Sequence, residues 1–75
     1  MNRHHKKMGQ YVAVEMIPVS NHMKNYFFSV DIGIEHTNSG YEYHLFKNNQ
    51  DGKLYAYNYD LNRMYKIELD LTTTN

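Results

Sequence analysis

The sequence predicts an all-β fold, a five-stranded antiparallel meander, from three observations. Apolar and polar residues alternate with a period of two in several short segments, as in half-buried strands. Clusters of Gly, Asn, Asp and Ser separate these segments at short intervals, which favours hairpins over the long crossovers that parallel strands need. An apolar period of 3.6 residues never persists for the ten or more residues of a typical helix.

The first two predicted strands lie on either side of a short connection. Alternation begins at Gln10, and Pro18, which cannot donate a ladder hydrogen bond, ends this strand or places it at a sheet edge. The stretch 20–25 (SNHMKN) is predicted to be a connection with room for one helical turn. The strongest strand signal follows at 26–35, where β-branched and aromatic residues dominate.

Three hairpin turns organise the rest of the chain. TNSG at 37–40 is a turn cluster, and NNQDG at 48–52 contains the Asp-Gly pair that is typical of hairpins. A third turn is predicted at 60–63. The remaining strands are predicted at 41–46, 54–59 and 65–71.

The domain organisation is predicted to be simple. A single all-β domain at 9–71 follows a flexible basic arm at 1–8 and precedes a polar tail at 72–75. A chain of 75 residues buries only roughly 60% of its unfolded surface, so small domains usually need an additional source of stability. The absence of cysteine excludes disulfides and thiolate metal sites, which leaves a His or carboxylate metal site, a well-packed core or association.

Tyrosines at alternate positions in LYAYNYDL, 54–61, suggest a functional surface. Matching apolar faces across the hairpins places Tyr43 opposite Tyr57 and Tyr41 opposite Tyr59, with Leu45 opposite Tyr55. In the hairpins on either side it places Ile34 opposite Tyr43 and Tyr57 opposite Ile67. One continuous apolar face is then predicted, made of Val30, Ile32, Ile34, Tyr41, Tyr43, Leu45, Tyr55, Tyr57, Tyr59, Tyr65, Ile67 and Leu69.

Core packing accounts for much of such a row, because cross-strand aromatic pairs are ordinary sheet stabilisers. Tyrosine is also enriched in protein interfaces, and a wet rim suits its hydroxyl better than a closed core. The predicted binding residues are Tyr41, Tyr43, Tyr55, Tyr57 and Tyr59.

These features predict a small non-enzymatic protein-binding module, such as an inhibitor, adaptor or regulatory subunit. The alternative is a single-stranded nucleic-acid-binding module in which the tyrosines stack on bases and the N-terminal arm contacts phosphate. A formal net charge of zero, from 8 basic and 8 acidic residues, favours the protein partner, because nucleic-acid binders usually carry a basic excess. A third reading is a small-molecule site in a barrel mouth lined by Tyr41, Tyr43, Tyr57 and Tyr59.

Metal binding and catalysis receive less support. The same register places Glu35 opposite Glu42, so His36 and His44 are predicted to approach both carboxylates. Such a donor set could hold a cation, but scattered His and Glu are more often ordinary surface residues. We therefore predict no metal and no cofactor. No Ser-His-Asp arrangement can be placed, and a sheet with short loops offers little pocket, so an enzyme is not expected.

Cellular location and source are predicted from composition. No apolar run approaches the ~20 residues of a membrane span, and the N-terminus lacks a signal-peptide pattern, so a soluble cytoplasmic protein without membrane contact is expected. Abundant Asn, Lys, Tyr and Ile are typical of AT-rich genomes, including those of phages and mobile elements in low-GC bacteria.

Self-association is the firmest of the partner predictions. A five-stranded sheet with one apolar face and no helix to cover it would expose more apolar surface than monomers usually do. A homodimer with two-fold symmetry is the commonest way to cover such a face. The predicted fold is thus either a small open barrel or a single sheet packed on a second copy.

Overall fold

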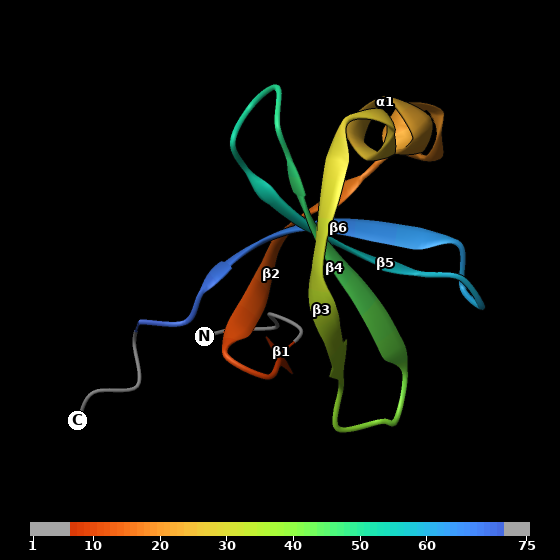
Figure 1. Cartoon of the computed structure of the whole chain (residues 1–75). Coiled ribbons are helices and arrows are strands. Elements are labelled where there is room, and N and C mark those ends of the chain that lie inside the picture. The colour runs from red at the N-terminus through yellow and green to blue at the C-terminus, as the bar shows by residue number, and fades with distance from the viewer. Residues whose placement is uncertain (1–6, 72–75) are drawn as a thin grey trace.

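The computed structural model describes residues 7–71 and shows a curled, open six-stranded sheet, in effect a half-barrel, with one short helix (Figure 1). All neighbouring strands are antiparallel, in the order β1-β2-β6-β5-β4-β3. The all-β antiparallel prediction is confirmed, with six strands in place of five. The strands are β1 (Lys7–Met8), β2 (Tyr11–Ile17), β3 (Ser29–His36), β4 (Glu42–Asn48), β5 (Leu54–Asn58) and β6 (Arg63–Leu69).

The chain departs from a simple meander after β2. Strands β3 to β6 form consecutive hairpins as predicted, but β2 pairs with β6, the last strand. Pro18 ends β2, and a 3-10 turn, η1 (Val19–Asn21), and a helix, α1 (His22–Phe27), then lead to the opposite edge of the sheet. No helix in residues 7–71 has the length and apolar character needed to cross a membrane.

Helix α1 occupies a segment that was predicted partly as strand. The predicted strand at 26–35 begins only at Ser29, because Tyr26 belongs to the helix and stacks on Phe46 of β4 with ring centroids 4.7 Å apart. The strand preference of Tyr26 is therefore overridden by its tertiary contact. The expectation that no helix covers the sheet is wrong.

Residues 1–6 and 72–75 lie outside the described residues, so most of the predicted arm at 1–8 and the whole tail at 72–75 do as well. Lys7 and Met8 nevertheless form β1, pairing with Val12 and Tyr11 of β2. Met8 is completely buried. The sheet thus begins inside the range assigned to the arm.

The predicted register of the last two hairpins is wrong by an odd number of residues. Tyr57 lies opposite His44 and Met64, where Tyr43 and Ile67 were expected. An odd shift moves every side chain of one strand to the other face relative to its neighbour. The tyrosines therefore do not share one face.

Asparagine and aspartate side chains set these registers by tightening the turns. In the β4–β5 loop, Asn48 Oδ1 accepts a hydrogen bond from the Gln50 amide and Asp51 Oδ1 accepts one from the Lys53 amide, both at 2.8 Å. In the β5–β6 loop, Asn58 Oδ1 accepts from the Leu61 amide at 2.7 Å. Such side-chain-to-backbone bonds select a shorter loop than face matching alone suggests.

A β-bulge changes the pairing of β3 with β4. The predicted register holds for Ser29 to Asp31, but it shifts at Ile32, so that Glu35 lies opposite Tyr43 in place of Ile34. Gly33, with φ 140°, provides the backbone conformation that the shift requires. A second bulge lies in β2, between Ala13 and Glu15.

The sheet carries a hydrophobic core on each face, since the adjacent residues Leu45 and Phe46 of β4 are both 2% exposed. The β1-side core consists of Met8, Ala13, Tyr43, Leu45, Ala56, Tyr65 and Ile67. The α1-side core consists of Ile17, Phe46, Tyr55 and Met64, with Tyr26 and Tyr57 packed against it. In Figure 1, α1 and β1 lie at opposite ends of the sheet.

The β1–β2 turn closes the β1-side core against β3. Gly9 has φ 61°, a conformation that favours glycine, and a Cβ there would overlap the Glu35 carboxyl group. The β1–β2 turn, at one edge of the sheet, thus approaches β3 at the other edge, as expected for a half-barrel. Tyr43 lies opposite Glu35 in the β3–β4 pairing and has no exposed surface.

Candidate functional site

The five tyrosines predicted to bind a partner lie in three different environments. Tyr43 is in the β1-side core, whereas Tyr55 and Tyr57 belong to the α1 side. Tyr41 and Tyr59 are 42% and 55% exposed. The structure therefore does not bring the five residues together as one surface.

Tyr43 is a core residue with no exposed surface. Burial, reinforced by the neighbouring Tyr65, raises its pKa to about 12. Within residues 7–71 its hydroxyl is the one buried side-chain polar atom that lacks a hydrogen-bond partner. Tyr43 thus serves packing and offers no surface to a partner.

A second set of aromatic rings, which includes Tyr26, Tyr57 and Tyr59, forms a connected group on the α1 side. The Tyr57 ring meets Tyr59 edge-on at 4.7 Å and His22 at 5.5 Å. The hydroxyls of Tyr26 and Tyr59 hydrogen-bond at 2.6 Å, and burial together with this bond raises the pKa of Tyr26 to about 12. The Tyr57 hydroxyl donates to Asn62 Oδ1 at 2.6 Å. Here each tyrosine combines an apolar contact with a satisfied hydroxyl.

A run of exposed apolar side chains follows α1 into the edge strand β3. These side chains are 42–73% exposed, and they are Phe27, Phe28, Val30, Ile32 and Ile34. Strand β3 has only β4 as a strand neighbour, so its other edge is not covered by a strand. The prediction that Val30, Ile32 and Ile34 share one continuous face with the tyrosines is wrong, because the bulge at Ile32 places Ile34 opposite His44 and Val30 opposite Lys47, on different faces of the sheet. The signal that could have found this surface is Gly33, because an isolated glycine within a strand suggests a bulge.

Tyr59 extends this surface along the α1 side of the sheet. Its ring contacts His44 edge-on at 4.8 Å, and His44 lies opposite Ile34 in the β3–β4 pairing. We call the exposed residues of 27–34 together with Tyr59 the β3 surface. Tyr41 lies in the β3–β4 turn, at the far end of the strand.

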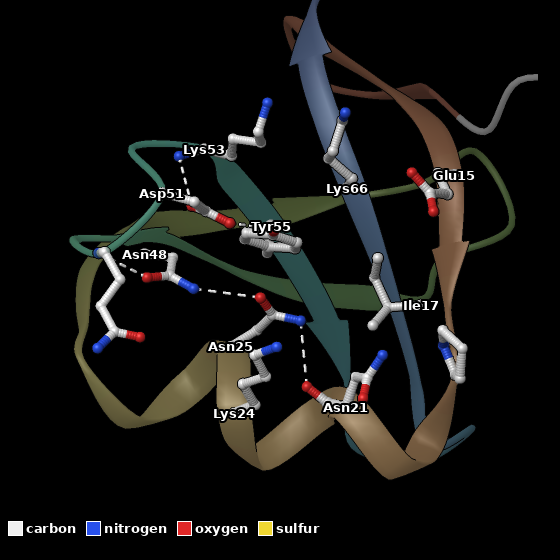
Figure 2. A pocket seen from close by; sticks show the side chains of 12 residues that line it. Glu15, Ile17, Asn21, Lys24, Asn25, Asn48, Asp51, Lys53, Tyr55 and Lys66 are labelled. Atoms are coloured by element: carbon white, nitrogen blue, oxygen red, sulfur yellow. Dashed lines mark hydrogen bonds between the residues drawn. The ribbon is translucent and has the colours of Figure 1, made fainter.

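The second notable feature is a polar cleft of about 430 Å³ on the α1 side (Figure 2). Lys24 of α1, Lys53 before β5 and Lys66 of β6 line it, together with the carboxylates of Glu15 and Asp51. The other lining residues are Ile17, Pro18, Asn21, Asn25, Asn48, Gln50 and Tyr55. Sequence analysis missed this cleft, because its residues come together only through the α1 crossover.

Hydrogen bonds fix one wall of the cleft. Asn48 Nδ2 donates to Asn25 Oδ1 at 3.1 Å, and Asn25 Nδ2 donates to the Asn21 carbonyl at 3.1 Å. The Tyr55 hydroxyl donates to Asp51 Oδ2 at 2.7 Å. Desolvation by burial, followed by this bond, raises the pKa of Tyr55 to about 12. For Asp51, desolvation by burial raises the pKa. The hydrogen bonds from the Tyr55 hydroxyl and the Lys53 amide outweigh this effect, so the pKa of Asp51 is lowered overall.

The predicted His–Glu group forms only in part. His36 and His44 both reach Glu42, with Nε2 to carboxylate distances of 3.6 and 3.1 Å. Glu35 does not lie opposite Glu42 as predicted, because the bulge places His36 there. Among residues 7–71, no three His, Cys, Asp or Glu side chains are arranged to hold a metal ion.

The chain matches no protein-family model, no curated protein and no solved structure. The β3 surface and the polar cleft are the two candidate functional sites in residues 7–71.

Proposed function

We propose that this protein is a small non-enzymatic protein-binding module, an inhibitor, adaptor or regulatory subunit, whose partner docks on the β3 surface. The observation that carries the proposal is the uncovered edge of β3 flanked by exposed apolar side chains. A cytoplasmic location and a phage or mobile-element source belong to the same proposal and rest on composition.

Strand addition is the binding mode that this surface supports. An extended segment of the partner would pair with the free main-chain groups of β3, and alternate side chains would give specificity. Natural edge strands are usually protected by charge, bulges or cover. The bulge at Ile32 and the acidic residues Asp31 and Glu35 provide some protection, but three large aliphatic side chains stay exposed.

The tyrosine row contributes through its exposed members. Tyr59 widens the apolar surface beside Ile34, and Tyr41 flanks the turn that follows β3. Tyr55 and Tyr57 hold the sheet beneath this surface, with Tyr57 in edge-on contact with Tyr59. The proposed contact residues are therefore Tyr59 and Tyr41 together with the β3 side chains.

Self-association through the same edge is part of the proposal. Antiparallel pairing of two β3 strands about a two-fold axis at Ile32 would place Val30 opposite Ile34 of the second copy. Because the bulge at Ile32 puts Val30 and Ile34 on opposite faces of the sheet, this contact would rest on main-chain pairing of the two edges and on the two Ile32 side chains at the axis. A homodimer would in this way cover the edge when no other partner is present.

Light scattering coupled to size exclusion tests the surface. We expect a dimer at micromolar concentration and a monomer for Ile32→Lys and Ile34→Lys, because each places a charge in the paired edge. Val19→Lys is the matched control, since Val19 is exposed in η1, away from β3. A folded monomer of 9.0 kDa in the wild type would remove the homodimer.

Selection from a peptide-display library tests the partner-binding mode independently. Apolar, strand-forming peptides should be enriched, and Ile34→Lys should lose them while Val19→Lys keeps them. Selected peptides that bind both variants equally well would contradict docking at β3.

Single-stranded nucleic acid remains the alternative function. Within the tyrosine row its support is limited to the exposed rings of Tyr41 and Tyr59, because a stacking platform needs accessible aromatic faces and Tyr43 has none. If this function is correct, affinity for single strands should fall steeply with salt, and removal of residues 1–6 should flatten the slope.

A further inference from the structure

We propose that the polar cleft on the α1 side binds a small phosphate monoester. Three lysines from three separate parts of the chain line this cleft, and Figure 2 shows Lys53 and Lys66 near one another at one end and Lys24 across the cleft from them. The cleft is distinct from the β3 surface, with which it shares no residue. The two proposals therefore stand or fall separately.

The lysines are free to meet an anion. Within residues 7–71, none of Lys24, Lys53 and Lys66 has a carboxylate oxygen within 4.0 Å of its ammonium group. Lys66 is half-buried as a residue, and its ammonium group lies at the end of a flexible stem that can turn toward a bound anion. A charged acceptor would supply the bonds that such a group lacks.

The carboxylates of the cleft only partly offset these charges. Asp51 already accepts hydrogen bonds from Tyr55 and from the Lys53 amide, which directs both of its oxygens into the loop. Glu15 lies opposite Lys66 in the β2–β6 pairing. The cleft is thus lined by three lysines and two carboxylates, and both oxygens of the Asp51 carboxylate already accept hydrogen bonds within the protein.

The buried side-chain amides of Asn25 and Asn48 provide further hydrogen-bond donors, which also favour an anionic ligand. Asn25 and Asn48 are 9% and 4% exposed, and each donates one N–H to a protein acceptor. An amide nitrogen carries two N–H groups, so each residue retains a second donor. Ammonium and amide donors in one cleft favour a ligand that is rich in acceptors.

Size and charge favour a small ligand over a polyanion. A volume of about 430 Å³ lies within the range of small-molecule sites, roughly 300–1,000 Å³, and the zero net charge of the chain gives no general attraction for nucleic acid. A phosphate monoester brings three acceptor oxygens and a charge near −2, which match the three lysines. Ile17 and Pro18 provide an apolar wall for the organic part.

Titration followed by NMR tests the assignment with three probes: inorganic phosphate, glycerol 3-phosphate and succinate. Saturable shifts of cleft residues with either phosphate probe, at a Kd of about 1 mM or below, are expected. Glycerol 3-phosphate should bind at least as well as inorganic phosphate. Absence of saturation at ten times that concentration, or tighter binding of succinate, would overturn the assignment.

Substitutions of cleft residues that should weaken or strengthen phosphate binding test whether the phosphate binds in the cleft. Lys24→Gln, Lys53→Gln and Lys66→Gln should each weaken phosphate binding three- to tenfold, as expected for loss of one hydrogen bond of ordinary strength. Glu15→Gln should tighten it, because it removes a like charge at the rim. Lys47→Gln is the control: Lys47 is an exposed lysine of β4 outside the cleft.

Retained folding of each variant is checked by thermal unfolding, since exposed substitutions of this kind change stability by under about 0.5 kcal/mol. Equal weakening by Lys47→Gln would show a non-specific charge effect and overturn the site. Ile32→Lys should leave phosphate binding unchanged.

Discussion

The two faces of the sheet are built from similar residues but with different physical character. The β1-side core is dry: Met8, Tyr43 and Ala56 have no exposed surface, and Tyr43 keeps a buried hydroxyl without a partner. The α1-side core is polar at its margin, where the hydroxyls of Tyr26, Tyr55 and Tyr57 all form hydrogen bonds.

This difference between the two cores indicates which face of the sheet serves stability alone and which face also offers binding surfaces. The β1-side core is closed by the sheet itself and by the Gly9–Glu35 contact. The α1-side core is covered by a helix of only six residues, which leaves the cleft beside it and the β3 surface after it. Substitutions should therefore affect mainly stability on the first face and both stability and binding on the second.

The largest expected difference is between Tyr43 and Tyr57. Tyr43→Ala should lower the free energy of unfolding by about 3–5 kcal/mol, the range for large aromatic residues in a core. Tyr57→Ala should cost less, because Tyr57 is only half-buried. Urea unfolding measures both, and a larger cost at Tyr57 would contradict the distinction between the cores.

The phenylalanine variants sharpen the same comparison. Tyr43→Phe should be neutral or stabilising, since it removes an unpartnered buried hydroxyl. Tyr57→Phe removes a formed hydrogen bond to Asn62 and should cost up to about 1 kcal/mol. A clear loss of stability in Tyr43→Phe would indicate that its hydroxyl has a partner after all.

Alkaline pH should unfold the protein through both cores. The pKa values of Tyr26, Tyr43 and Tyr55 are raised to about 12 in the folded state, so folding favours their protonated forms. Their contribution to stability is complete below pH 10, the ordinary tyrosine pKa, and is lost as pH rises toward 12. Tyrosinate absorbance and circular dichroism should change together in this interval. Full ionisation of all tyrosines near pH 10 in folded protein would contradict the raised values.

A smaller loss of stability is expected at the β1–β2 turn. Gly9→Ala should lower stability by about 1–3 kcal/mol, because it combines a positive φ with overlap on the Glu35 carboxyl group. Gly52→Ala is the matched control, with φ 73° and nothing within 4 Å of the added Cβ. Equal costs at the two sites would mean that the turn does not close against β3.

The smallest expected effect concerns the Tyr55–Asp51 bond at the margin of the α1-side core. Tyr55→Phe should cost about 1 kcal/mol at neutral pH, the usual value for one hydrogen bond. The Asp51 pKa is lowered in the folded state, so its contribution is present above the ordinary value of 3.8 and is lost as pH falls below it. Urea unfolding between pH 5 and 3 should therefore show a smaller acid-induced loss for Tyr55→Phe than for the wild type.

Much of the fold could be predicted from local pattern. Period-two alternation and turn clusters located β3 through β6 to within a few residues, apart from the start of β3 at Ser29. The antiparallel arrangement followed from the short spacing of the turns. Neither β1 nor the body of α1 carries enough periodicity to be predicted, because one is two residues long and the other six.

The candidate site was less predictable. The tyrosine row was predicted to lie on one face of the sheet, but the structure distributes it over two faces, because Asn48, Asp51 and Asn58 shorten the loops by hydrogen-bonding to their own turns. The cleft joins residues that are more than 40 positions apart, such as Lys24 and Lys66. No local pattern contains that information.

The sequence by itself determined the strand character, the positions of the turns and the neutral charge, since these depend on residues that are neighbours in the chain. Only the three-dimensional arrangement establishes which tyrosines are buried, which residues line the cleft and which strand is left at the edge. Those features depend on register and on the path of α1 across the sheet. A loop that is one residue shorter shifts the register by one and moves every side chain of the next strand to the other face of the sheet. The neighbours of Tyr43 and Tyr57 are therefore defined only by the complete pairing of the strands.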